Sequence, residues 1–197
     1  MRYEEYIRNF ARDFAENSII DSEEFPETDM SADEVASFIS SKLAVYGKDP
    51  LLSKNMIGNL VKKGIIPPPE KRQYDREQVV LLELVLMLSM AYRSQDVEAL
   101  MKPIVENRAS LLDEQNDFYD YYVKLVPLFK NLRKDAAERT VGLIDVMKDS
   151  MREAATDDDD TMEIFLVLLA IAMEVDTAMY IGKRLLREYF TEPEKKE

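Results

Sequence analysis

The chain has 197 residues, of which 46% are hydrophobic and 33% charged, and its net charge of −13 makes it strongly acidic. This composition is that of a soluble globular protein with one good core or two small ones, and it excludes overall disorder. The sequence contains no cysteine, which excludes disulfides, thiolate zinc sites and cysteine redox sensors and favours a reducing cytoplasm as the compartment. It also contains no histidine, the residue that most often acts as a general base.

The first predicted helix covers residues 3–17, and an acidic connector containing Pro26 follows it. The apolar face of this helix is formed by Tyr3, Ile7, Phe10 and Phe14. A capping box at Ser31 and Glu34 predicts the start of a second helix, because the two side chains can satisfy free backbone donors there. This helix is predicted to run to about Val45, and the turn-forming segment 46–50 ends it.

The third predicted helix covers residues 53–63, with Ser53 as its N-cap and Gly64 as its C-cap. At 100° per residue, one arc is apolar and predicted to pack, and it consists of Met56, Ile57, Leu60 and Val61. The other arc is polar and consists of Lys54, Asn55, Gly58, Asn59 and Lys62. Gly58 costs about 1 kcal/mol of helix propensity relative to alanine, which favours a close approach by a ligand or by another helix at that position.

The local net charge of the chain is positive only around this third helix. Residues 48–76 hold seven basic residues against three acidic ones, whereas the rest of the chain is acidic. The basic residues are Lys48, Lys54, Lys62, Lys63, Lys71, Arg72 and Arg76. An acidic protein needs a local basic patch of this kind to bind a polyanion, and the alternative is an ordinary solvated helix face.

A stiff proline segment at residues 67–69 separates this helix from the next one. A ligand for a proline-recognition module is the alternative interpretation of the three prolines. Asp75 and Gln78 form another capping pair, which opens a helix that is apolar on nearly every side through Leu88. This helix is predicted to be the buried centre of the N-terminal half.

A short helix is predicted from Ser94 to about Met101, and Pro103 is the predicted domain boundary. The division gives an N-terminal helical domain over residues 1–103, with its core at 31–102, and a C-terminal helical region over residues 104–197. Five glycines in the chain and few strand signals predict an all-α fold.

Long helices are predicted beyond this boundary. Two apolar faces are formed by Phe118, Tyr121, Tyr122, Leu125, Phe129 and Leu132, and by Ala137, Val141, Ile144, Met147 and Met151. Pro127 either kinks this segment or starts a new helix. The final helix covers residues 161–190 and its apolar surface needs a partner. Its uncharged run, 164–173, is half the ~20 residues that a membrane span requires, so no membrane association is expected.

The acidic run at residues 157–160 offers oxygen ligands for Mg²⁺ or Ca²⁺ but lacks the alternating spacing that wraps a loop around an ion. Asp160 as the N-cap of the last helix, with Glu163 at its third position, is the preferred interpretation, and no metal or cofactor is expected. The tyrosines and methionines of the C-terminal half line either an effector pocket or an ordinary core. These residues are Tyr119, Tyr121, Tyr122, Met147, Met151, Met162, Met173, Met179 and Tyr180.

Five short segments carry a resemblance. They are residues 25–27 (FPE), 30–35 (MSADEV), 53–57 (SKNMI), 61–69 (VKKGIIPPP) and 71–74 (KRQY). Together they resemble a family of small bacterial proteins catalogued as domain of unknown function 1836, over about residues 25–102. More distantly, the layout is similar to the winged helix-turn-helix of MerR-type transcription regulators.

The MerR resemblance implies a recognition helix at 53–63, a basic wing at 71–74 and a homodimer that binds double-stranded operator DNA. The DNA-binding residues that it implies are Ser53, Lys54, Asn55, Asn59, Lys62, Lys63, Lys71, Arg72 and Tyr74. Their chemistry agrees, because asparagine can pair with adenine and the cations can contact guanine or phosphate. The chain departs from the MerR pattern in having Gly58-Asn59-Leu60 where Arg-Tyr-Tyr is usual and a shortened wing.

Three classes of function remain. The leading hypothesis is a DNA-binding transcription regulator whose C-terminal helices dimerise and bind a small-molecule or protein effector. The alternative is a non-enzymatic protein–protein interaction module that has lost DNA binding. An enzyme is the third class and is not expected, because the sequence has no recognisable catalytic constellation.

Overall fold

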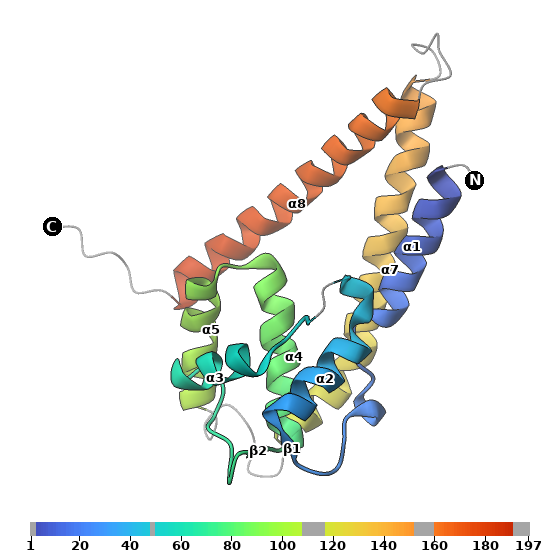
Figure 1. The fold of residues 1–197 in the computed structure, drawn as a ribbon. Coiled ribbons are helices and arrows are strands. Elements are labelled where there is room, and N and C mark those ends of the chain that lie inside the picture. Colours follow the sequence, from blue (N-terminus) through green and yellow to red (C-terminus); the bar gives the residue numbers. More distant parts are fainter. Residues whose placement is uncertain (1–2, 48–49, 108–116, 152–159, 191–197) are drawn as a thin grey trace, which may run out of the picture.

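The computed structural model describes residues 3–47, 50–107, 117–151 and 160–190. These residues are almost entirely helical, which confirms the all-α prediction (Figure 1). The elements are α1 (Tyr3–Asn17), η1 (Ser22–Glu24), β1 (Met30–Ser31), α2 (Ala32–Lys42), η2 (Ala44–Tyr46), α3 (Lys54–Lys62), β2 (Gln73–Tyr74), α4 (Arg76–Ala91), α5 (Ser94–Glu106), α7 (Phe118–Met151) and α8 (Asp160–Phe190).

The predicted helix starts are confirmed by their capping hydrogen bonds. Ser31 and Glu34 form the capping box of α2, and Asp75 and Gln78 form that of α4. The helix from Ser31 ends at Lys42 instead of Val45, because the chain turns there into the short helix η2. Strands β1 and β2, which precede α2 and α4, pair as a two-stranded antiparallel sheet. This pairing holds the start of α2 beside the start of α4.

Helix α4 is the buried centre of the fold, as predicted. Its fully covered apolar residues are Val79, Val80, Leu81, Leu82, Val85 and Leu86. Ile20, Ile39 and Ile57 cover this helix from other elements, and Tyr122 and Val126 of α7 belong to the same cluster. The core is therefore continuous from residue 19 to residue 126 and includes residues on both sides of the predicted boundary at Pro103.

Two helices extend through prolines. Helix α5 runs through Pro103 to Glu106, so the predicted end near Met101 is wrong. Helix α7 is one continuous helix through Pro127, which therefore starts no new helix. Asp117 and Asp120 cap the start of α7 through reciprocal bonds of 2.9 and 3.0 Å, and the Phe118 N–H donates to Glu77 of α4.

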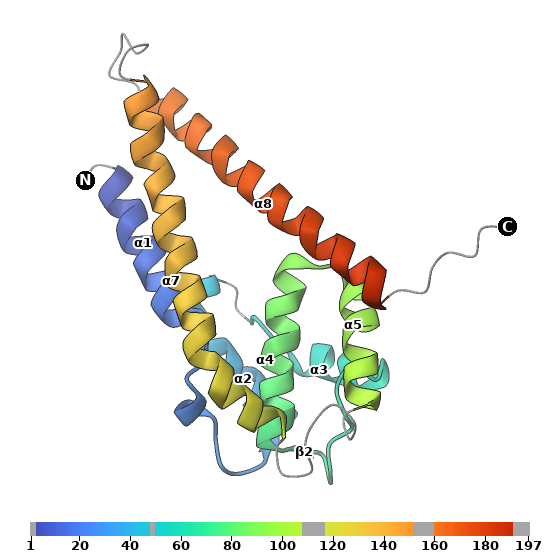
Figure 2. The ribbon, with the colours of Figure 1, turned by 180° about the vertical axis from the view of Figure 1, so that it is seen from behind.

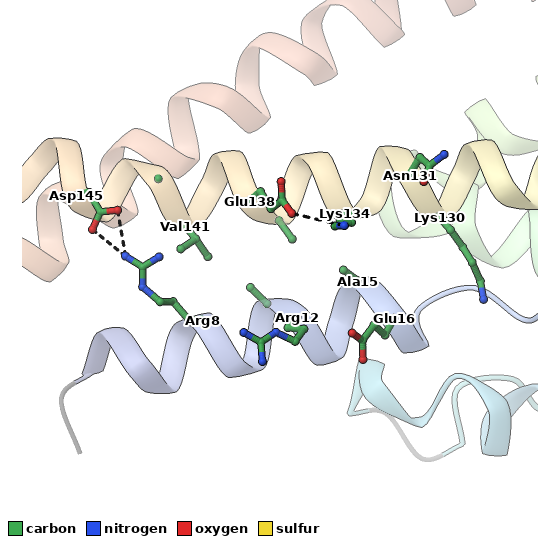
Figure 3. Close-up of a pocket in the computed structure, with 13 residues that line it drawn as sticks. Arg8, Arg12, Ala15, Glu16, Lys130, Asn131, Lys134, Glu138, Val141 and Asp145 are labelled. Atoms are coloured by element: carbon green, nitrogen blue, oxygen red, sulfur yellow. Dashed lines mark hydrogen bonds and ion pairs between the residues drawn. The ribbon is translucent and has the colours of Figure 1, made fainter.

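Helices α1 and α7 run side by side (Figures 1 and 2). A groove of about 780 Å³ lies between them, and Figure 3 shows Arg8 of α1 reaching Asp145 of α7 at 2.8 Å across it. Ala11 and Ala15 of α1 line this groove, and such small side chains let two helices approach closely. The predicted apolar face of α1 is partly wrong, since Phe10 is 55% exposed.

Helix α8 meets α7 at one end and α5 at the other, and most of its length is exposed. Residues Thr161–Phe190 are long and apolar enough to cross a membrane, with a mean hydropathy of 2.0 in their most apolar stretch. The prediction of no membrane segment considered only the uncharged run at 164–173, whereas the apolar stretch continues beyond Glu174 and Asp176. Met173 and Tyr180 are 66% and 70% exposed, so they line no enclosed effector pocket.

Residues 157–159 of the acidic run lie outside the described residues. Asp160 is the first residue of α8. Within the described ranges, no group of three or more acidic side chains is arranged to hold a metal ion.

Glu83 of α4 is a buried carboxyl group that the sequence did not predict, and its side chain is 0% exposed. Its Oε1 accepts a hydrogen bond of 2.9 Å from the Ile20 N–H, and its Oε2 has no hydrogen-bond partner among the described residues. Burial raises the pKa of Glu83 to about 7, and the Ile20 N–H acts against this rise by stabilising the carboxylate. Near neutral pH the fold therefore contains a partly protonated carboxyl group.

Glu83→Gln should make stability less dependent on pH. Because the folded-state pKa of about 7 lies above the ordinary value of 4.5, the stability that protonated Glu83 contributes is fully present below pH 4.5 and is lost as the pH rises through 7. The variant keeps an acceptor for Ile20 but has no proton to lose. Its free energy of unfolding relative to wild type should rise by about 3 kcal/mol between pH 4.5 and about pH 8. Urea unfolding at a series of pH values measures this difference, and a constant difference would contradict the assignment.

Candidate nucleic-acid interface

Helix α3 is fixed at both ends by local hydrogen bonds. The Ser53 hydroxyl accepts from the Met56 N–H at 3.3 Å, which confirms the predicted N-cap. At the other end, the Gly64 N–H donates to Val61 and the Ile65 N–H donates to Leu60, and Gly64 has a positive φ of 70°. This pair of bonds is the Schellman arrangement, so the predicted C-cap is also confirmed.

The predicted contact residues of α3 lie on its exposed side. They are Lys54, Asn55, Asn59, Lys62 and Lys63. Asn55 and Lys62 are seven residues apart and so lie along the middle of this face, while Lys54 and Lys63 lie at its two edges. The packed side consists of buried Ile57 with half-buried Leu60 and Val61. The prediction that Met56 packs is wrong, because its side chain is 45% exposed.

Both edge lysines are paired with carboxylates of neighbouring helices. Lys54 lies 2.7 Å from Asp33 of α2, and Lys63 lies 3.2 Å from Glu98 of α5. Hydrogen bonds from Lys102 and Lys63 lower the pKa of Glu98. Lys62 has no ion pair among the described residues, so the cation in the middle of the face is the most available one.

A tight turn carries the other two predicted cations. The Gln73 N–H donates to the Glu70 carbonyl at 2.7 Å, and the two central residues, Lys71 and Arg72, have φ of 46° and 67°. Two consecutive positive φ angles define a type I′ turn, which normally contains asparagine or glycine. Lys71 and Arg72 are exposed, and the turn is the lowest point of the ribbon in Figure 1. The structure thus holds two long cations in a costly backbone conformation at a protruding tip.

The proline segment connects this turn to the buried core. Gln78 of α4 is 5% exposed, and its Nε2 donates to the carbonyls of Pro67 and Pro68 at 3.0 and 3.1 Å. Ile65 and Ile66 just before the prolines are buried. Gln78, predicted only as a capping residue, therefore also fixes the path of the chain into the turn.

Two residues of the basic segment do not face outward. Tyr74 lies on β2 with its side chain turned inward and only 5% exposed, so its predicted contact with DNA is wrong. Burial raises the pKa of its hydroxyl. Arg76 donates to the Pro26 carbonyl at 3.1 Å, and its guanidinium lies 4.6 Å from the ring centre of Tyr119. This arginine holds the connector before α2 against α7.

A small groove of about 330 Å³ borders the α3 face. Its apolar lining residues are Leu52, Met56, Leu60, Leu82, Val85 and Leu86. Its polar lining residues are Asn59, Lys63, Ser89 and Ser94, and the Lys63 ammonium donates to the Ser94 hydroxyl at 3.1 Å. Asn59 therefore lies at the edge of the exposed face, between a polar surface and an apolar depression.

Gly58 has open space around it. A Cβ at this position would meet no other atom within 4 Å, so none of the described residues approaches closely enough to require glycine. The predicted alternative of a packing contact with another helix is therefore wrong. The other predicted reason for glycine at this position, the close approach of a bound ligand, remains a prediction.

The arrangement supplies hydrogen-bond donors and positive charge. Amides on α3 can donate and accept, and the cations can bind phosphate. Within the part of the chain that the structure describes, no cluster of three acidic residues could hold a metal ion. The exposed amides and cations of α3 and the turn are therefore suited to bind an anionic partner.

Residues 20–122 match the model of a family described as Domain of unknown function (DUF1836). The match begins five residues before the predicted resemblance, which covers about residues 25–102, and it continues through α5 into α7. It contains α3, the proline segment and the turn at residues 70–73. No curated protein and no solved structure matches the chain.

Gly58→Ala should stabilise the protein. Alanine is the better helix former and the added methyl group meets nothing, so the free energy of unfolding should rise by about 0.5–1 kcal/mol. Gly64→Ala is the matched control and should lower it by at least about 1 kcal/mol, because φ is 70° there. Urea unfolding measures both changes. A destabilised Gly58→Ala variant would reveal a contact that this surface does not show.

Proposed function

The chain belongs to the DUF1836 family, and we propose that its family-matched unit binds double-stranded DNA as a transcription regulator. In this proposal α2 and α3 act as a MerR-like helix-turn-helix, and the turn at residues 70–73 acts as a wing. The protein acts by occupying or distorting its operator in the cytoplasm, without chemistry.

The observation that carries the proposal is the conformation of Lys71 and Arg72. Both residues have a positive φ, which costs on the order of 1 kcal/mol or more for each residue other than glycine. Asparagine and glycine would form the same turn with less strain. Side-chain chemistry that is useful at the tip accounts for the cost, and two long cations suit phosphate binding.

On α3, Asn55 and Lys62 have the central roles. Asn55 can pair with adenine through two hydrogen bonds, and Lys62 can contact guanine or phosphate. Lys54 and Lys63 add charge at the edges after exchanging Asp33 and Glu98 for phosphate. Exposed ion pairs of this kind contribute only about 0.2–1 kcal/mol, so DNA can displace them. Asn59, which lines the groove, has a smaller role than the sequence alone suggested.

A protein-interaction module is the second candidate function. Two features favour it: the edge lysines are already paired, and the apolar groove beside Met56 offers a place for a partner's side chain. An acidic helix could bind there through the same cations. Salt dependence distinguishes the candidates, because duplex DNA releases counterions and gives a log–log slope of about −0.9 for each neutralised phosphate.

Replacing Lys71 and Arg72 together with glycine should weaken DNA binding without harming the fold. Glycine accepts a positive φ, so the change removes two cations and relieves strain at the same time. Affinity for both operator and random duplexes should fall, and the salt slope should decrease by about two. Fluorescence anisotropy between 50 and 200 mM salt measures both, with an operator selected from a random oligonucleotide pool.

The matched control for this experiment is Arg12→Gln with Lys134→Gln. It removes two cations from the α1–α7 groove, so it changes the net charge equally but leaves the turn intact. If the control and the glycine variant lose affinity to the same extent, only the net charge matters and the wing assignment fails. A flat salt response of the wild type would support the protein-interaction module.

Asn55→Ala should lower specificity instead of overall affinity. Loss of two hydrogen bonds to a base should cost about 1–3 kcal/mol on the selected operator and much less on random DNA. Asn59→Ala, in the lining of the groove, serves as the comparison and should cost less. Equal losses on operator and random duplexes would show that Asn55 does not contact a base.

A further inference from the structure

The exposed apolar surface of the described chain is concentrated on α8. Twelve large apolar side chains of this helix are each at least 36% exposed. They are Met162, Ile164, Phe165, Leu168, Leu169, Met173, Val175, Tyr180, Ile181, Leu185, Tyr189 and Phe190. They lie on several sides of the helix, and a helix that is apolar nearly all round is normally buried. The described part of the chain covers α8 only near its ends.

The position of α8 is fixed where it touches the rest of the chain. Near one end Val167 is buried, and Ile144 of α7 is buried in the same region. Towards the other end, the Tyr92 hydroxyl occupies the space that a side chain at Gly182 would need. Between these contacts the two helices diverge, and α7 and α8 form the arms of a V (Figures 1 and 2).

The facing side of α7 is apolar as well. Leu125 and Leu132 are 39% and 55% exposed, and they are seven residues apart. Arg139 continues the same row after another seven residues, and it lies 3.8 Å from Glu174 of α8. This row is therefore turned toward α8, and both arms carry exposed apolar side chains.

We infer that a second copy of this chain covers α8, with the α8 helices of the two copies packed against each other on the side that carries Leu169, Met173 and Tyr180. These two helices then form the centre of a dimer with a two-fold axis. Twelve half-exposed large side chains amount to roughly 1,000 Å², slightly more than the ~800 Å² that one partner contributes to a standard interface. This inference does not depend on DNA binding.

A membrane is the competing occupant for such a helix, and the charges of α8 argue against it. Glu174 and Asp176 lie near its centre, where each carboxylate would cost about 2.5–3.5 kcal/mol in a bilayer. Glu174 is also paired with Arg139, which lies on a helix packed along α1. In a protein interface that is open to water at its edge, these groups keep their solvation and their partner.

The charges of α8 also set the orientation of the pair. Its first half carries three acidic residues and no basic one, whereas Lys183, Arg184 and Arg187 in the second half outnumber Asp176 and Glu188. An antiparallel pair places each acidic half beside a basic half, while a parallel pair places like charges together. Overlap along the exposed side puts the two-fold axis between Glu174 and Val175 and sets Leu169 level with the partner's Tyr180.

The first test is the mass of the full chain in solution. Light scattering and sedimentation at about 50 μM should give twice the chain mass of 22.8 kDa. Leu169→Glu with Met173→Glu should give a monomer of unchanged helix content, because both side chains are already exposed. Phe10→Glu is the matched control, since it adds a charge at an equally exposed apolar site on α1 and should leave the dimer intact.

Single cysteines test the antiparallel geometry, because the chain contains none. Leu169→Cys and Tyr180→Cys lie on the packed side, and each should fail to link alone, since eleven residues of helix put each about 16 Å from its own copy. A mixture of these two variants should link. Linking of each alone and not of the mixture would overturn the antiparallel arrangement.

A monomeric wild type at 50 μM would overturn the dimer, and so would flotation of the wild type with phosphatidylcholine–phosphatidylglycerol vesicles. The proposal of DNA binding is tested independently of the dimer. The Lys71→Gly, Arg72→Gly variant should remain dimeric whatever its DNA affinity, and the α8 double variant should keep the unchanged α3 face.

Discussion

A helix that is apolar on every side must be covered on every side, and α4 places this constraint on the rest of the fold. Helices α2, α3, α5 and α7 and the chain between α1 and α2 each contribute to the cover, and the two-stranded sheet fixes where α2 and α4 begin. The polar groups of α4 are used to attach these covering elements. Glu83 holds the Ile20 N–H, Gln78 holds the proline segment, and Glu77 holds the first N–H of α7. The candidate interface is thus positioned from the buried centre outward.

The sequence could predict what depends on neighbouring residues. The caps at Ser31, Ser53 and Asp75 follow from hydrogen bonds across three positions, and the burial of α4 follows from composition alone. Contacts between distant segments were not predictable in this way. Phe10 fitted an apolar stripe, yet small Ala11 and Ala15 face α7. Tyr74 looked like a wing residue, but strand alternation turns it inward while Lys71 and Arg72 stay at the tip. Glu83 was visible as the one carboxylate within an apolar run, and only the fold explains it.

The electrostatics of the α3 face differ from what a count of basic residues indicates. Of its three lysines, the two at the edges lie against Asp33 and Glu98, which belong to helices that support α3. Such pairing lowers the local positive charge in the free protein and keeps an otherwise cationic surface compatible with the acidic remainder of the chain. The side chains at the turn have no comparable carboxylate partner among the described residues, so the tip carries the less neutralised charge.

The ends of the family-matched segment meet in space. Ile20 donates to Glu83 and accepts a 2.7 Å hydrogen bond from the Tyr122 hydroxyl, so residues 20 and 122 are adjacent although they bound the match. A unit whose two ends lie together can be inserted into, or extended by, other chains without being rebuilt, because additions leave from one place. Helix α1 and the rest of α7 are such additions, and they pack on each other as they leave it. The core of the family-matched segment therefore places no constraint on the length of the chain that is attached at this point.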